Sequence, residues 1–146
     1  MINGNLLIVD DEPDLLFVLE YALKEFADQI IIASNGAEAL KIIASHKIHC
    51  ILCDMNMPKM NGVELIKIIR KENIEIPFIF YTGHGTQDLM VEAIKYGAFD
   101  FLYKPLMDGL EQAVERGLRK GSGKDDLIND SDYVISDFRK LLLNKD

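Results

Sequence analysis

Short apolar runs alternate with amphipathic segments along most of the chain. Each apolar run has the length and the aliphatic or aromatic content of a strand, and several are continuously apolar. In the segments between them, apolar residues recur every three or four positions, which is typical of helices that bury one face. The five runs are NLLIVDD, QIIIAS, HCILCD, IPFIFYT and AFDFLY.

Five helices are predicted after these strands. The first runs from Pro13 to Phe26, and the second starts at Ser34-Asn35-Gly36 and continues to about residue 46. The third spans about 61–73, the fourth 86–96, with Gly97 suited to follow its end, and the last 106–120. The apolar stripe of the first helix is predicted to contain Leu15, Leu19, Ala22 and Phe26.

The alternation predicts a doubly wound, three-layer α/β domain. Continuously apolar strands are expected in a parallel sheet that helices cover on both faces. A length of 146 residues fits one domain. In such sheets chemistry occurs beyond the carboxyl ends of the strands, so the residues that follow each strand are the candidates for function.

Composition narrows the classes of partner. The chain is 49% hydrophobic and 27% charged, as is ordinary for a globular protein, and its formal net charge is −8. That acidity disfavours nonspecific binding to nucleic acid or to an anionic membrane. No apolar run reaches the length of a membrane span, and the N-terminus lacks a signal-peptide pattern, so a cytoplasmic location is expected.

The two cysteines, Cys50 and Cys53, form a C-x-x-C pattern inside a predicted strand. A redox pair would normally occupy a strand-to-helix turn, and a zinc site would need a second ligand pair. Alternation along the strand places the two side chains on opposite faces. We therefore interpret both cysteines as small core residues.

Polar residues stand where four of the strands end. Asp10 and Asp11 follow the first strand, Asp54 the third, Thr82 ends the fourth and Lys104 follows the fifth. Each residue alone could be a helix cap, a turn residue or a solvated side chain. Together, three carboxylates at one edge would raise one another's pKa and favour a hard divalent cation such as Mg²⁺. Three aspartates, one lysine and Mg²⁺ have no net charge, and such a site suits a phosphoryl group.

At these positions the chain resembles the receiver domain of two-component response regulators. The motifs are IVDDEPD, DMNMPKMNG, YTG and FLYKP, in order, within a region of about residues 5–120. The resemblance implies a five-stranded parallel sheet of order 2-1-3-4-5, a flavodoxin-like three-layer sandwich. It also implies a cis peptide bond between Lys104 and Pro105.

The resemblance assigns the acidic residues to phosphoryl transfer and to metal binding. Asp54 would be the phosphoacceptor. Asp11, Asp54 and the backbone carbonyl of Asn56 would bind Mg²⁺, with Asp10 acting mainly through a metal-bound water. Asn56 and His84 occupy the two positions that tune phosphoryl lifetime in the family, although His84 could equally be a plain loop residue.

The remaining family residues would sense the phosphoryl group. Lys104 would pair with one phosphoryl oxygen and Thr82 would hydrogen-bond another. Phe101 matches the aromatic residue that turns inward when the threonine moves, although core packing is its alternative. Phe99 and Tyr103 beside it are predicted to be core residues.

The implied role is signalling in a bacterial phosphorelay rather than enzymatic turnover. A histidine kinase or phosphotransfer protein would donate the phosphoryl group. The surface of the fourth helix, fifth strand and fifth helix would then be read by a partner or by a second copy in a homodimer. Direct binding of nucleic acid or membrane by this chain is not expected.

Two alternatives remain open from the sequence. The first is a phosphatase that forms an aspartyl phosphate, although such enzymes usually have a second acid where Asn56 stands. The second is a receiver-like interaction module that works without phosphorylation, although Asp10, Asp11, Asp54, Thr82 and Lys104 are all retained.

The receiver domain is predicted to cover 1–120, with a linker and a short tail over 121–146. Gly121-Ser122-Gly123 interrupts the pattern and polar residues follow. The tail regains helical spacing at Val134, Phe138 and Leu141, and Phe138 is expected to pack on the same or another chain. Either the chain is a stand-alone receiver or it is part of a longer regulator or hybrid kinase.

Overall fold

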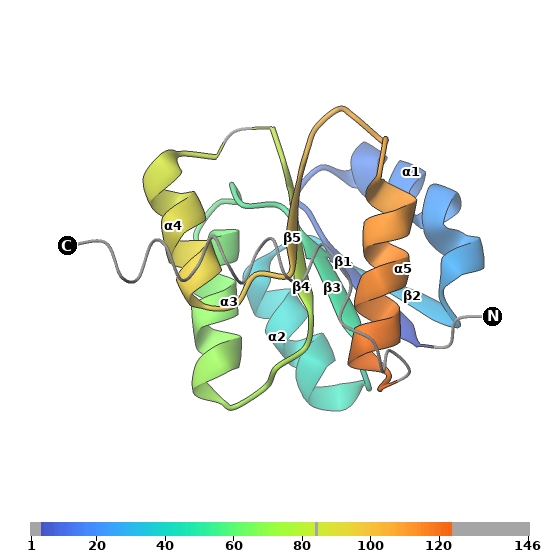
Figure 1. The fold of residues 1–146 in the computed structure, drawn as a ribbon, viewed down its shortest axis with the longest axis horizontal. Coiled ribbons are helices and arrows are strands. Elements are labelled where there is room, and N and C mark those ends of the chain that lie inside the picture. Colours follow the sequence, from blue (N-terminus) through green and yellow to red (C-terminus); the bar gives the residue numbers. More distant parts are fainter. Residues whose placement is uncertain (1–3, 84, 124–146) are drawn as a thin grey trace.

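A five-stranded parallel sheet with helices on both faces forms the fold (Figure 1). The computed structural model describes residues 4–83 and 85–123. The strand order is β2-β1-β3-β4-β5, which confirms the predicted doubly wound, flavodoxin-like topology. The order reverses at β1, so β1 and β3 are neighbours although a strand separates them in the sequence.

Strands and helices alternate throughout the described residues. The strands are β1 (Asn5–Val9), β2 (Gln29–Ala33), β3 (Cys50–Cys53), β4 (Phe78–Thr82) and β5 (Asp100–Tyr103). The helices are α1 (Pro13–Leu23), α2 (Gly36–Ser45), α3 (Gly62–Lys71), α4 (Gln87–Lys95) and α5 (Leu110–Gly121), with a 3-10 turn, η1 (Lys24–Phe26), after α1. None of these helices is both long and apolar enough to span a membrane.

Alternating side chains of the strands build two cores, one on each face of the sheet. One core contains residues from α1 and α5, and the other contains residues from α2, α3 and α4. In β3, Cys50 belongs to the α1/α5 core and Cys53 to the opposite one. Both thiols are free and buried, and burial raises their pKa, so the prediction of core cysteines is confirmed.

The first helix buries a different stripe from the predicted one. Leu16, Leu19 and Leu23 are buried, whereas Leu15 and Phe26 are half-buried. Leu15 and Phe26 pack against the margin of the same core, so the buried face of the helix is centred on Leu16, Leu19 and Leu23. The helix also ends at Leu23 and tightens into η1, so the prediction of a helix through Phe26 was wrong in its last turn.

The last helix starts later than predicted. Gly109, its N-cap residue, has φ of 83°, a left-handed conformation that does not fit a helix interior. The segment from Leu106 to Gly109 therefore forms a loop, and Leu110 is the first helical residue. The predicted cis bond between Lys104 and Pro105 is confirmed and lies at the start of this loop.

Candidate functional site

The carboxyl ends of the strands bring three charged residues to one edge of the sheet. The backbone N–H of Asp10 donates to Ala33 O at 3.1 Å, and that of Asp54 donates to Val9 O at 3.0 Å. On the other side, Lys104 N donates to Thr82 O at 3.0 Å. Each residue thus extends the sheet by one step beyond its strand, which fixes where its side chain starts.

Lys104 joins the two buried carboxylates. Its Nζ donates to Asp10 Oδ2 at 2.8 Å and to Asp54 Oδ2 at 3.0 Å. Asp10 and Asp54 are buried, and the Lys104 side chain is only 14% exposed. Residues distant in the chain therefore form one ion-paired cluster, as the order of the strands predicts.

Burial and pairing shift the pKa values of this cluster. Burial raises the pKa of Asp10, and the hydrogen bond from Lys104 only partly offsets that rise. Repulsion from Asp54 makes the smallest contribution, so burial exceeds the mutual repulsion expected from the sequence. For Lys104, burial alone would lower the pKa, but the hydrogen bonds to Asp10 and Asp54 raise it to about 12.

A set of oxygens suited to a divalent cation lies in this cluster. One carboxylate oxygen each from Asp10, Glu12 and Asp54 lies within 4.8 Å of the others, close enough to contact one ion. Hard oxygen donors of this kind are those that Mg²⁺ prefers. Glu12 was not among the predicted site residues, although it directly follows the two aspartates in the sequence.

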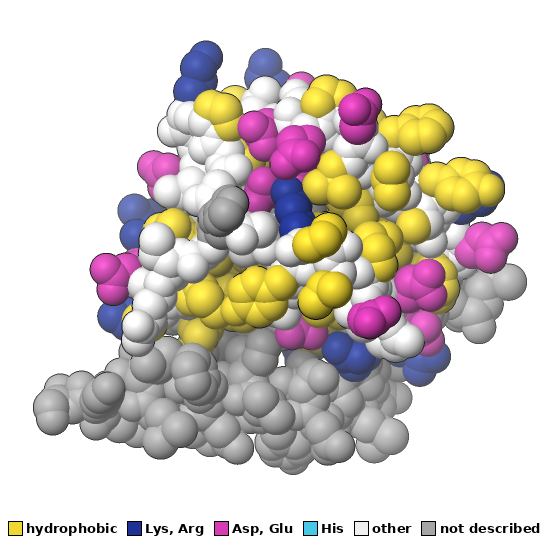
Figure 2. All heavy atoms as spheres, turned by 90° about the horizontal axis from the view of Figure 1, so that it is seen from above, with side chains coloured by type: hydrophobic (Ala, Val, Ile, Leu, Met, Phe, Trp, Pro, Cys, Tyr) yellow, Lys and Arg dark blue, Asp and Glu magenta, His cyan; other side chains and the backbone are white. Residues whose placement is uncertain are grey.

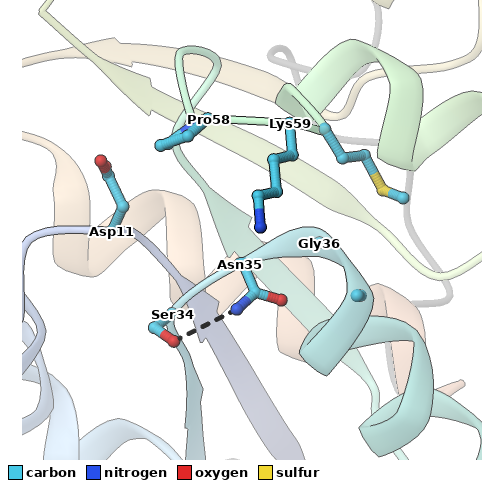
Figure 3. Close-up of a pocket in the computed structure, with 8 residues that line it drawn as sticks. Asp11, Ser34, Asn35, Gly36, Pro58 and Lys59 are labelled. Atoms are coloured by element: carbon cyan, nitrogen blue, oxygen red, sulfur yellow. Dashed lines mark hydrogen bonds between the residues drawn. The ribbon is translucent and has the colours of Figure 1, made fainter.

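Asp11 does not join the three clustered carboxylates. It is exposed and lines a neighbouring pocket of about 450 Å³ between the loops after β2 and β3 (Figure 3). Figure 3 shows the Lys59 side chain pointing toward Asn35, with Asp11 on the opposite side of the pocket. The proposed role of Asp11 as a metal ligand therefore stays a prediction.

The loop after β3 shapes the surroundings of Asp54. The backbone N–H of Asn56 donates to Asp54 Oδ1 at 3.2 Å, while the Asn56 residue is exposed. Gly62 N donates to Met55 O at 2.9 Å, and Asn61 caps α3 together with Glu64 in a capping box. The loop is thus anchored at both ends close to Asp54.

The two residues predicted to switch lie on neighbouring strands. Thr82 is buried at the end of β4, and Phe101 is half-buried in β5, with its ring stacked on Phe80 at 5.5 Å between centroids. Phe99 is buried, as predicted, but Tyr103 is 48% exposed and its predicted core position was wrong. Tyr103 ends an edge strand, where no further strand covers it.

Exposed hydrophobic side chains lie on elements that border the site. Phe17 on α1 and Leu106 in the loop after β5 are 71% and 61% exposed. Figure 2 looks onto the edge where the strands end and shows basic and acidic side chains in contact, with hydrophobic ones beside them.

Two predictions concern residues that the structure does not describe. His84, the second position expected to tune phosphoryl lifetime, lies outside the described residues, as does Phe138.

The fold and this cluster of charges define a receiver domain. The sequence profile of the response regulator receiver domain matches residues 6–115, and the chain belongs to that family. The chain is 34% identical over 115 residues to the transcriptional regulatory protein ZraR of Klebsiella oxytoca. It is 37% identical over 114 residues to the response regulator protein PilR of Pseudomonas aeruginosa.

These matches cover 78% and 77% of this chain. The chain spans only about a quarter of the curated relatives, 26% of the length in both cases.

Solved receiver domains have the same fold. That of a putative LuxO repressor protein from Vibrio parahaemolyticus has a TM-score of 0.77 at 30% identity and covers 85% of this chain and 96% of its own. The receiver domain of a protein from Clostridium thermocellum has a TM-score of 0.74 at 30% identity. It covers 82% of this chain and 97% of its own.

Proposed function

We propose that this receiver domain accepts a phosphoryl group on Asp54 from a histidine kinase or a phosphotransfer protein. The proposal depends on the position of Lys104 in a buried acidic cluster. Its Nζ lies 2.8 Å from Asp10 Oδ2 and 3.0 Å from Asp54 Oδ2. An ammonium group held there is ready to pair with a phosphoryl oxygen. Membership in the receiver family supports the same role.

In the proposed reaction a carboxylate oxygen of Asp54 attacks the phosphorus of a phosphohistidine. The new O–P bond makes an acyl phosphate, the N–P bond breaks, and its electron pair stays on the histidine of the donor. Lys104 neutralises charge on the phosphoryl oxygens during the transfer. Thr82, which is buried at the end of β4, would hydrogen-bond another of these oxygens.

The donor set fits Mg²⁺. Asp10, Glu12 and Asp54 each offer a carboxylate oxygen there. We retain Asp11, Asp54 and the backbone carbonyl of Asn56 as the proposed ligands, with Asp10 acting mainly through a metal-bound water. Bound there, Mg²⁺ would neutralise charge on the carboxylates and the phosphoryl group.

The proposed output is a change in the surface of α4, β5 and α5. Phosphorylation changes the local charge only slightly, so the signal must come from geometry. Phe101 stacks on Phe80 beneath this surface, and the Tyr103 hydroxyl lies 3.7 Å from Met90 Sδ, which links β5 to α4. A partner or a second copy of the chain would recognise the rearranged surface.

The decisive test is phosphorylation of the chain and of Asp54→Asn. The parent chain, given Mg²⁺ and acetyl phosphate or a phosphorylated kinase, is expected to gain one phosphoryl group by intact-protein mass spectrometry. Asp54→Asn is expected to gain none, because it lacks the nucleophile. Equal phosphorylation of both proteins would refute the assignment of Asp54.

Two further measurements address the two alternatives. A phosphatase would hydrolyse phosphomonoesters through many turnovers, whereas the proposed receiver does not. An interaction module that works without phosphorylation would show no phosphorylation and no spectral change with beryllofluoride and Mg²⁺. The retained cluster around Lys104 favours the receiver over the interaction module, and Asn56 in place of a second acid favours it over the phosphatase.

A further inference from the structure

Glu12 is a third carboxylate that faces Lys104. Its Oε1 lies 3.6 Å from Lys104 Nζ, which is farther than the carboxylate oxygens of Asp10 and Asp54. In contrast to those two buried side chains, the Glu12 side chain is 64% exposed. The outward side of the ammonium group therefore faces a carboxylate that solvent also reaches.

The backbone of Glu12 is fixed while its side chain is not used in the helix cap. Glu12 N donates to Asp10 Oδ1 at 3.0 Å, which ties the residue to the buried cluster. Glu12 is the N-cap residue of α1, but its side chain makes no capping hydrogen bond, and Pro13 follows it. The carboxylate can therefore leave Lys104 by rotating its side chain, without disturbing α1.

We propose that the Glu12 carboxylate competes with the incoming phosphoryl group for Lys104. The inference rests on the proposed function of Asp54 as phosphoacceptor. A phosphoryl group on Asp54 must bring anionic oxygens to Lys104, and a carboxylate already lies on the exposed side of that ammonium. Glu12 must release Lys104 before the phosphoryl oxygen can pair with it, so Glu12 slows phosphorylation and weakens binding of phosphoryl analogues.

Three variants separate a contact effect from a charge effect. Glu12→Gln keeps the size and removes the charge, whereas Glu12→Asp keeps the charge and shortens the reach by one methylene. Asp14→Asn is the matched control, because Asp14 is an exposed carboxylate in the first turn of α1 outside the carboxylate cluster. Each protein is compared with the parent chain at saturating Mg²⁺.

The measurements are the initial rate of phosphorylation by subsaturating acetyl phosphate and the affinity for beryllofluoride. Glu12→Gln is expected to increase both by about two- to fivefold, the factor that an exposed ion pair is worth. Glu12→Asp is expected to behave like Glu12→Gln, because the shorter side chain no longer reaches Lys104. Asp14→Asn is expected to match the parent chain.

Three results would overturn the inference. Unchanged values in Glu12→Gln would show no competition, and values for Glu12→Asp equal to those of the parent chain would assign the effect to charge alone. A slower reaction with weaker Mg²⁺ binding in Glu12→Gln would make Glu12 a metal ligand instead. If the parent chain is not phosphorylated at all, the proposed function itself fails, and the inference with it.

Discussion

At the scale of single residues, burial of the Asp10 carboxylate at the strand ends has an electrostatic cost. Asp10 is buried, and burial raises its pKa even though Lys104 lies 2.8 Å away. A raised pKa in the folded state means that folding favours the protonated form over the ionised one. The stabilisation is complete below the ordinary pKa of an aspartate and is lost as the pH rises through the raised value. Above this raised pKa, the ionised Asp10 therefore reduces the stability of the chain in the absence of Mg²⁺.

Asp10→Asn is accordingly expected to stabilise the metal-free protein at neutral pH. The melting temperature should rise by about 2–8 °C for each kcal/mol gained in a domain of this size range. Far-UV circular dichroism in EDTA measures the change. The gain should shrink toward low pH, where Asp10 of the parent chain is protonated. A lower melting temperature for Asp10→Asn at neutral pH would contradict this account.

At the scale of elements, the start of α3 lies against the backbone of Asp54, directly after β3. A Cβ at Gly62 would collide with the backbone carbonyl oxygen of Asp54 and would lie 2.9 Å from Phe80 Cε1. Neither atom can move cheaply, because one belongs to the backbone and the other to a buried ring. Glycine at this position lets the loop after β3 close over the site.

Gly62→Ala is therefore expected to destabilise the fold by about 1–3 kcal/mol, the usual cost of overpacking. Gly36→Ala is the matched control, because Gly36 also begins a helix after an asparagine cap. The atoms nearest to a Cβ at Gly36 all belong to the flexible side chain of Met60, so Gly36→Ala should lose less stability. Urea unfolding followed by circular dichroism compares the two, and equal losses would contradict the argument.

At the scale of the whole molecule, metal binding and folding are linked. The carboxylates that would bind Mg²⁺ come from strands that only the fold brings together, so the unfolded chain has no such site. At a concentration of 100 times the dissociation constant, Mg²⁺ should stabilise the fold by about 2.7 kcal/mol. The parent chain should melt at higher temperature in Mg²⁺ than in EDTA at equal ionic strength.

The matched variants make this measurement specific. Asp54→Asn removes a proposed ligand and should lose most of the gain, whereas Asp14→Asn should keep it. A gain that is the same in both variants would mean that Mg²⁺ acts elsewhere on the acidic surface.

Much of this protein could be predicted from local pattern. The apolar runs predicted all five strands, and the three central ones, β1, β3 and β4, are buried as an unbroken apolar sequence indicates. Asp10, Asp54 and Lys104 were found because strand ends meet at one edge in a parallel sheet. The caps at Asn35 and Asn61 could also be read locally, since a cap is a contact within one turn.

The sequence by itself determined the family, the order of the elements and the residues at the strand ends. Only the tertiary structure decided which of two stripes on α1 faces the sheet, that Tyr103 is exposed, and that Glu12 rather than Asp11 joins the clustered carboxylates. The physical reason is the same in each case. Neighbouring residues of one helix, edge or loop satisfy the local pattern equally well, and only packing against distant parts of the chain distinguishes them.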